Sequence, residues 1–210
     1  MRRVPYPVSI ITATDPNPSH HHHHPNVNNS APELSYRGMT VSSFNTVTLT
    51  PEPVISFNVK RPSETLTALR HSGRFLAHLL APNKATATLA RDFSKGNHNL
   101  TILDGKGEFE FVGVDTAGSH SDGDGDGGNL KLPVLRRRGK NSADGVEDFP
   151  FVFECRVLDK EVEVYDHTIV LATVVRALVE PAGVGIVRDG RKNLCLTYAD
   201  TRFWGAGREI

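Results

Sequence analysis

Apolar and polar residues alternate along much of this chain, and that pattern predicts β-strands. Between residues 46 and 50, threonines alternate with Val47 and Leu49, which is typical of a strand with one buried face. Pro51 and Pro53 end the run, because proline has no N–H to donate to a sheet ladder. The same reasoning predicts strands at residues 8–14, 38–44, 46–50, 54–59, 75–80, 106–114, 149–158, 166–175 and 193–198, and residues 161–164 either extend the strand before them or begin a new one.

Residues 63–72 and 85–94 place apolar residues three or four positions apart, which predicts two short helices. Gly73 fits the position just past the first helix, where a left-handed conformation is common. A strand-rich chain with two short helices and no βαβ rhythm favours a mainly β, closed or Greek-key antiparallel barrel over a doubly wound sheet. The length of 210 residues fits one domain with loop insertions at about 15–35 and 115–145.

The predicted strand 149–158 alternates well, and we expect Phe151, Phe153, Cys155 and Val157 on one face. Cys155 and Cys195 are the only cysteines, and both lie in apolar strand-like runs. We interpret them as buried free thiols in a reducing compartment, since two cysteines alone do not make a four-ligand zinc site.

The first insertion contains His20–His24, and the second contains an Asp- and Gly-rich run, residues 117–129. Adjacent imidazoles on a loop impose no coordination geometry, so we expect no functional metal there. The Asp–Gly run mimics the start of a calcium loop, but Pro133 stands where that loop needs a glutamate. We interpret it as a flexible acidic loop, and the basic run 136–140 either pairs with it or stays solvated.

The charge balance argues against nucleic acid or membrane partners. Lysine plus arginine equals aspartate plus glutamate, with 24 of each. No apolar run approaches the ~20 residues of a membrane span. We expect a cytoplasmic protein, and an organellar destination directed by a presequence stays open.

The junction after the 54–59 strand has the chemistry of a phosphate site. Ser63 is a suitable N-cap for the helix that follows, and the N-terminus of a helix offers unpaired N–H groups with a partial positive charge. Lys60 and Arg61 add full positive charge, and Ser63 and Thr65 add hydroxyl donors. The alternative is a capped surface helix with two solvated basic residues.

Taken in order, these segments resemble the flavin reductase-like family of the FMN-binding split barrel. The resemblance rests on the run 38–44 (GMTVSSF), a second strand after a proline-containing turn, and the run 58–65 (NVKRPSET) that leads into a helix. It continues through 73–75 (GRF), 89–93 (LARDF) and 166–169 (DHTI), and it covers most of the chain apart from the two insertions.

The resemblance implies a Greek-key split barrel that binds FMN, with FAD possible, and that forms a homodimer with the flavin at the subunit interface. It also implies hydride transfer from NADH or NADPH to the flavin, with a monooxygenase as the candidate recipient of the reduced flavin. The flavin-binding residues it implies are Thr40, Val41, Ser42, Ser43, Phe44, Asn58, Val59, Lys60, Ser63, Thr65, Arg91 and Phe93. Arg91 has the alternative of a solvated helix charge, and Ser42 and Ser43 that of ordinary strand hydroxyls.

His167 matches a family histidine near the flavin, and we expect it on the nicotinamide side. Hydride transfer needs no proton relay from the protein, so we predict no acid–base role for it. Two other functions remain open: a flavoredoxin-like protein that keeps its FMN and passes electrons to a protein, and a non-catalytic flavin-binding or interaction barrel.

Overall fold

The computed structural model describes residues 3–16, 35–96, 102, 105, 107–117, 130–139, 148–178 and 195–205. In chain order the elements are β1 (Tyr6–Pro7), β2 (Ser9–Asp15), β3 (Ser35–Val41), β4 (Asn45–Thr48), β5 (Val54–Lys60), α1 (Glu64–Ser72), β6 (Arg74–Leu79), α2 (Lys84–Phe93), β7 (Phe109–Asp115), β8 (Lys131–Arg137), β9 (Phe151–Val164), β10 (His167–Ala177), β11 (Thr197–Ala199) and β12 (Arg202–Trp204). The fold is mainly β with two short helices, which confirms the predicted class.

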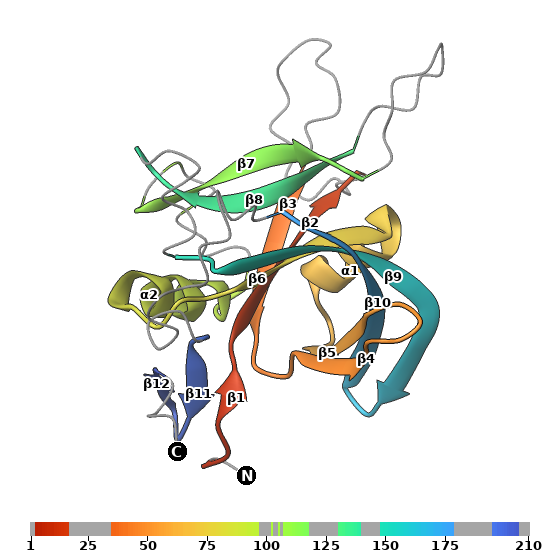
Figure 1. The fold of residues 1–210 in the computed structure, drawn as a ribbon, viewed down its shortest axis with the longest axis horizontal. Coiled ribbons are helices and arrows are strands. Elements are labelled where there is room, and N and C mark those ends of the chain that lie inside the picture. The colour runs from red at the N-terminus through yellow and green to blue at the C-terminus, as the bar shows by residue number, and fades with distance from the viewer. Residues whose placement is uncertain are drawn as a thin grey trace.

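A seven-stranded antiparallel sheet forms the centre of the molecule, in the order β3-β2-β6-β9-β10-β5-β4 (Figure 1). The ribbon of β7 and β8 lies above it in this view, and β1 joins β11 and β12 in a small sheet at the bottom. Strands β3 and β5 lie far apart in the hydrogen-bonded order, yet the backbone N–H of Asn58 on β5 donates to Ser43 Oγ, just past β3, at 2.8 Å. The sheet therefore curls until its two ends approach each other.

Both faces of this sheet are buried at β2 and β6, which explains why these strands do not alternate between buried and exposed residues. On β6, Leu76 packs in a cluster with α2 and the β7–β8 ribbon, whereas its neighbours Phe75 and Ala77 pack in a second cluster with α1. Strand β2 divides in the same way, with Ile10 in the first cluster and Ile11 in the second. The two helices are thus fixed against opposite faces of one sheet.

Buried polar contacts connect the β7–β8 ribbon to the sheet. Thr12 Oγ1 donates to the carbonyl of Pro133 at 2.6 Å. His78 is completely buried; its Nδ1 lies 3.2 Å from the carbonyl of Ile10, and its Nε2 accepts from the N–H of Leu135 at 3.1 Å. Burial disfavours the imidazolium and lowers the pKa of His78 to about 4. The side chain is therefore a neutral, fully hydrogen-bonded part of the core.

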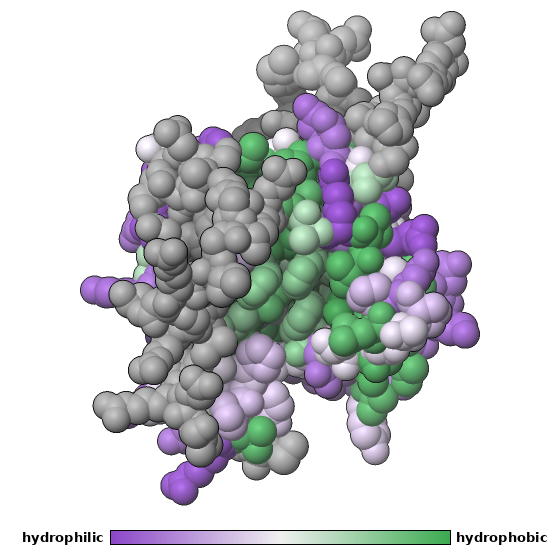
Figure 2. Space-filling view, in the orientation of Figure 1, coloured by the Kyte–Doolittle hydropathy of each residue, from purple (hydrophilic) through white to green (hydrophobic). Residues whose placement is uncertain are grey.

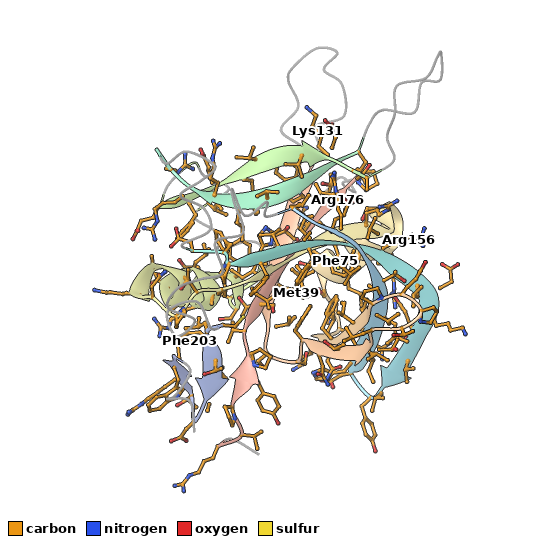
Figure 3. The ribbon with its side chains drawn as sticks, in the orientation of Figure 1. Met39, Phe75, Lys131, Arg156, Arg176 and Phe203 are labelled. Carbon is orange, nitrogen blue, oxygen red and sulfur yellow. The ribbon has the colours of Figure 1, made fainter. Side chains whose placement is uncertain are left out.

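A buried carboxylate lies close to the same ribbon. Glu154 on β9 is 0% exposed, and its oxygens accept from Arg74 at 2.8 Å, from Arg176 at 2.7 Å and from the N–H of Ala117 at 3.0 Å. Arg176 lies in the upper part of the molecule, just below the ribbon (Figure 3). A buried charge is tolerated only when it is paired and hydrogen-bonded in this way.

Strand β8 was not predicted, because it lies within the segment 115–145 that we interpreted as a loop. Pro133 and the basic run interrupt the alternation of apolar and polar residues in this segment. The pairing of β8 with β7 cannot be recognised from the local sequence. The prediction that the basic run stays solvated is wrong for Arg136 and Arg137, whereas a pairing with the Asp–Gly run lies outside the described residues. Arg136 pairs with Glu110 at 2.8 Å, and Arg137 pairs with Asp148 at 2.7 Å and with Glu108.

The predictions for β9 and for the two cysteines are confirmed in part. Residues 161–164 extend the strand before them, since β9 is continuous. Phe153, Cys155 and Val157 share a packed face as predicted, but Phe151 is 49% exposed. Cys155 is buried and Cys195 only partly so, and both are free thiols. Burial raises the pKa of both thiols, which keeps them protonated.

The final predicted strand, 193–198, is shorter in the described residues, where β11 begins at Thr197 and pairs with an unpredicted β12. The His tract and the Asp–Gly run lie outside the described residues. None of the helices in the described part of the chain has the length and apolar character needed to cross a bilayer.

Candidate flavin-binding site

A cavity of about 860 Å³ opens between the N-terminus of α1 and the C-terminal end of α2. That volume lies within the range of small-molecule sites, about 300–1,000 Å³. The ends of β3 and β5 form its floor. The lining residues are Gly38, Met39, Thr40, Val41, Ser42, Ser43, Asn58, Val59, Lys60, Pro62, Ser63, Glu64, Thr65, Thr67, Phe93, Ser94, Gly96 and His167.

Local sequence determines where α1, whose first turn lines this cavity, begins and ends. Ser63 is the N-cap, with an extended backbone and a side-chain oxygen that accepts from the N–H of Leu66 at 3.2 Å. Gly73 ends the helix at φ 64°, a conformation that glycine adopts without strain. Leu66 and Leu69 are buried beneath the helix. The first turn of α1 is therefore held rigidly with its N–H groups at the cavity, as the sequence predicts.

Only one of the two expected basic residues faces this cavity. Lys60 lines it, and its Nζ lies 3.7 Å from Asp166 with both side chains more than half exposed. Arg61 instead lines a neighbouring pocket, pairs with Glu163 at 2.9 Å and donates to the carbonyl of Tyr165 at 2.6 Å. The prediction that Arg61 adds charge at this cavity is therefore wrong, because Arg61 follows the last residue of β5 and its guanidinium is held by Glu163 and by the carbonyl of Tyr165.

His167 lies beside Lys60, because β10 pairs with β5 in a register that places these two residues opposite each other. Its Nδ1 is 2.7 Å from Asp166 Oδ1. This hydrogen bond lowers the pKa of the Asp166 carboxyl, with a smaller contribution from the Lys60 ammonium. An ionised carboxylate can only accept, so Nδ1–H donates and Nε2 remains available for another partner. Asp166 was not predicted as a site residue, although it stands next to His167 in the DHTI run.

The α2 end of the cavity has an apolar wall. Phe93 is 1% exposed, and its ring lies directly against the backbone of Gly38. A Cβ at Gly38 would come within 2.4 Å of Phe93 Cε1, so only glycine fits there. Thr40 Oγ1 donates to the carbonyl of Ala90 at 2.6 Å and so connects β3 to α2. Gly38 was not predicted as a site residue. The one signal for it in the sequence is the presence of a glycine within a predicted strand.

The structure brings together all the predicted site residues except Phe44 and Arg91. Phe44 is not part of the cavity lining and packs, partly buried, against the core cluster beneath α1. Arg91 lines an adjoining pocket of about 240 Å³ that shares Thr40, Ser42 and Ser94 with the main cavity. Its guanidinium lies 5.5 Å from the centroid of the Phe203 ring, which Figure 3 shows on β12. Contact of either residue with a flavin stays a prediction.

The donor set of this cavity fits a phosphorylated aromatic ligand. One end offers backbone N–H groups, hydroxyls and the Lys60 ammonium, and the other offers the Phe93 wall. Met39, labelled near the centre of the molecule in Figure 3, is also part of the lining. Within the described residues, no three His, Cys, Asp or Glu side chains are grouped so that they could hold a metal ion. The site is thus arranged to bind and orient an organic anion.

Comparison with known proteins agrees with this arrangement. The sequence model described as a flavin reductase like domain matches residues 1–204. Among solved structures, the chain is similar to the NADH:FAD oxidoreductase of Streptomyces globisporus C-1027, at 19% identity and a TM-score of 0.59 over 98% of this chain and 89% of that one.

It is also similar to the styrene monooxygenase flavin reductase of Pseudomonas putida S12, at 20% identity and a TM-score of 0.60 over 100% of this chain and 95% of that one. A flavin reductase domain protein from Arthrobacter sp. FB24 matches at 16% identity and a TM-score of 0.61, over 100% and 92% of the two chains. These structural likenesses show a common fold, and the domain match extends over almost the whole sequence. The chain therefore belongs to the flavin reductase-like family.

Proposed function

We propose that this protein is an NAD(P)H-dependent flavin reductase whose flavin occupies the cavity between α1 and α2. The observation that carries the proposal is a single cavity that joins a capped helix N-terminus and a lysine to an aromatic wall. A bound flavin accepts a hydride from a reduced nicotinamide, and the protein's task is to hold and orient the two molecules.

The phosphate of the flavin is assigned to the α1 end of the cavity. The N–H groups of the first helical turn, the hydroxyls of Ser63 and Thr65, and the Lys60 ammonium can all donate to it. Glu64 also lines this end, but its carboxylate lies 3.4 Å from the Arg37 guanidinium, which offsets its charge. Lys60 is 72% exposed, so its attraction for a phosphate decreases as salt rises.

The floor and the α2 end are assigned to the ribityl chain and the ring. Asn58 and Val59 lie along the floor from the phosphate end, and Ser42 and Ser43 offer hydroxyl and backbone groups beside them. Ser43 Oγ already accepts from Asn58 N–H, which leaves its own hydrogen to donate toward a ligand. Phe93 gives the ring apolar contact.

His167 is assigned to the nicotinamide side. Asp166 fixes the imidazole with Nδ1–H as donor, so Nε2 can accept a hydrogen bond from the carboxamide of the donor. This is a binding and orienting role without proton transfer. Asp166 and Lys60 would then set the position of His167 rather than contact the reacting atoms.

We extend the proposal to a homodimer in the cytoplasm that supplies reduced flavin to a partner oxygenase. Strand β4 forms an edge of the main sheet, and Val47 on it and Leu49 just after it are 56% and 71% exposed. Figure 2 shows hydrophobic surface at the lower right, over β4, β5 and the β9–β10 hairpin. An exposed apolar sheet edge supports the burial of this region by a second subunit.

The test is a flavin titration followed by an anaerobic assay with each nicotinamide. We expect FMN or FAD to bind at micromolar concentration and NADH or NADPH to be oxidised as flavin is reduced. No binding of either flavin at that concentration would contradict the proposal. Flavin retained through gel filtration with poor turnover of added flavin would favour the electron-transfer alternative.

A further inference from the structure

The pocket of about 240 Å³ that adjoins the main cavity at Arg91, here called the Arg91 pocket, has a wall of its own. It lies between the C-terminal end of α2 and the small sheet of β1, β11 and β12, which Figure 1 shows directly below α2. Its volume is below the ~300–1,000 Å³ of sites for larger ligands, so it suits a molecule with one ring. The lining consists of Val8, Thr40, Ser42, Ala90, Arg91, Ser94, Tyr198, Thr201 and Phe203.

One wall of the Arg91 pocket is aromatic. Strand pairing places Tyr6, Tyr198 and Phe203 in one row across the small sheet, and residues directly opposite each other lie on the same face. The rings of Tyr198 and Phe203 meet edge to face with centroids 5.4 Å apart, and both side chains are only partly buried. Val8, which is buried, extends this wall with aliphatic surface. A flat apolar ring therefore finds both aromatic and aliphatic contacts here.

Arg91 is the one charged residue among those that line this pocket. Its guanidinium has no carboxylate partner within the described part of the chain, and it lies 5.5 Å from the centroid of the Phe203 ring. The neighbouring carboxylate of Asp92 is held by Lys95 at 3.0 Å. A guanidinium placed over an aromatic ring keeps its N–H edge for a planar anion. Its single charge matches a carboxylate better than the dianion of a phosphate.

Three of the four serine and threonine hydroxyls in the lining are already used as donors within the protein. Thr40, Ser94 and Thr201 each donate to a backbone carbonyl, at 2.6, 2.7 and 2.6 Å. A hydroxyl whose hydrogen is engaged can only accept, so it gives no hydrogen bond to an anion. The Arg91 guanidinium is therefore the donor that fixes the position of an anion in this pocket.

We propose that the Arg91 pocket binds a single-ring aromatic carboxylate, with the carboxylate on the Arg91 guanidinium and the ring against Tyr198 and Phe203. The pocket shares three residues with the main cavity and adds its own aromatic wall, so the acid and a flavin can be bound together. The inference goes beyond the proposed function, because it gives the protein a second small-molecule ligand. It also makes this acid, rather than the flavin, the partner of Arg91.

The test is a titration of the flavin-free protein with benzoate and with benzamide, which have the same ring and differ in charge. Ligand-observed NMR detects such binding in the millimolar range. We expect benzoate to bind about tenfold more tightly than benzamide, because only the carboxylate accepts charge-assisted hydrogen bonds from Arg91 with both oxygens. Saturation of the protein with FMN should leave the affinity for benzoate unchanged.

Variants of the pocket wall separate the charge from the ring. Arg91→Gln weakens benzoate about tenfold and abolishes its advantage over benzamide. Phe203→Leu keeps an apolar side chain, removes the ring and weakens both ligands. The matched control is Arg202→Gln, which changes an exposed arginine on β12 outside the lining of this pocket and alters neither affinity. Thermal unfolding checks that each variant is folded, and the comparison of the two ligands in the parent protein needs no variant.

Equal affinities for benzoate and benzamide in the parent protein, or no binding of benzoate at millimolar concentration, would overturn this inference. Displacement of benzoate by FMN would also overturn it, because the pocket would then belong to the flavin. None of these results counts against flavin binding in the main cavity. If no flavin binds, the proposed function fails, and the titration with benzoate and benzamide still decides the inference.

Discussion

His78 and His167 both lie on strands of the main sheet, yet their surroundings differ in every respect that matters for function. His78 is fully buried, both of its ring nitrogens are hydrogen-bonded within the protein, and burial lowers its pKa to about 4. His167 is 46% exposed, lines the main cavity and uses Nδ1 to hold Asp166, while no contact of Nε2 is found in the described part of the chain. A polar side chain whose hydrogen-bonding groups are all satisfied within the protein supports the fold. A side chain that keeps an unused hydrogen-bonding group at a cavity can bind a ligand.

The carboxylates of the two regions differ in the same way. Glu154 is completely buried and accepts from two arginines and a backbone N–H. Asp166 is 56% exposed and contacts His167 and Lys60 at the edge of the cavity. The buried cluster where the β7–β8 ribbon meets the sheet should therefore determine stability, and the cavity should determine binding. The following variants test that separation.

The largest effect is expected for Glu154→Gln. Loss of the charge leaves Arg74 and Arg176 without their anion, and breaking a buried pair in this way lowers the free energy of unfolding by about 3–5 kcal/mol. Urea denaturation of the parent and the variant measures this change in the free energy of unfolding. The matched control, Asp166→Asn, changes an exposed carboxylate and should leave the denaturation midpoint close to that of the parent. Equal destabilisation by the two substitutions would erase the distinction between the regions.

The second effect is a pH dependence caused by His78. The unfolded chain takes up a proton near pH 6.5, whereas the folded protein does so only near pH 4. The free energy of unfolding should therefore decrease by about 3 kcal/mol as the pH falls through this window, and it should be unaffected by His78 above it. His78→Gln removes the titration, so the difference in stability between parent and variant should narrow on acidification. A difference that stays constant from pH 7 to pH 4.5 would contradict the assigned role.

The third effect concerns binding rather than stability. Lys60→Ala removes a charged donor from the phosphate end, and the dissociation constant of FMN should rise about tenfold or more, since a hydrogen bond to a charged group contributes about 1.5–3 kcal/mol. Thermal unfolding should be unchanged, because Lys60 is 72% exposed. Lys95→Ala is the matched control, an exposed lysine paired with Asp92 outside the cavity lining. Weakening by both variants to the same extent would indicate a general charge effect.

The smallest effect is expected for His167→Ala. One hydrogen bond to the nicotinamide contributes about 1 kcal/mol, so the rate of NADH or NADPH oxidation should fall about fivefold. Flavin affinity should change less than this rate does. Rapid-mixing measurements with saturating flavin separate the two quantities, and equal rates in variant and parent would remove His167 from the reaction.

The sequence predicted the parts of this molecule that depend on local signals. The N-cap at Ser63, the glycine that ends α1 and the strand that leads to Lys60 are all specified within a few residues. Because those signals are local, Lys60, Ser63 and Thr65 could be assigned to the phosphate end before the fold was known. The other predicted lining residues came from the family resemblance, which supplied Thr40, Val41, Ser42, Ser43, Asn58, Val59, Phe93 and His167.

What the sequence did not predict depends on contacts between distant segments. Strand β8 exists because β7 pairs with it, and the arginines that follow Pro133 find their partners at Glu108, Glu110 and Asp148. The side chain of Arg61, just past β5, is held away from the cavity by Glu163 on β9 and by the carbonyl of Tyr165. The close approach of Gly38 to Phe93 depends on how α2 packs over β3.

The central claim is that the N-terminus of α1 and Lys60 hold the phosphate of a flavin. The most direct measurement compares the affinities of FMN and riboflavin, which share the ring and the ribityl chain and differ only in that phosphate. We predict that FMN binds about tenfold or more tightly than riboflavin, and that the difference shrinks in Lys60→Ala and at high salt. Equal affinities of FMN and riboflavin in the parent protein would contradict the claim.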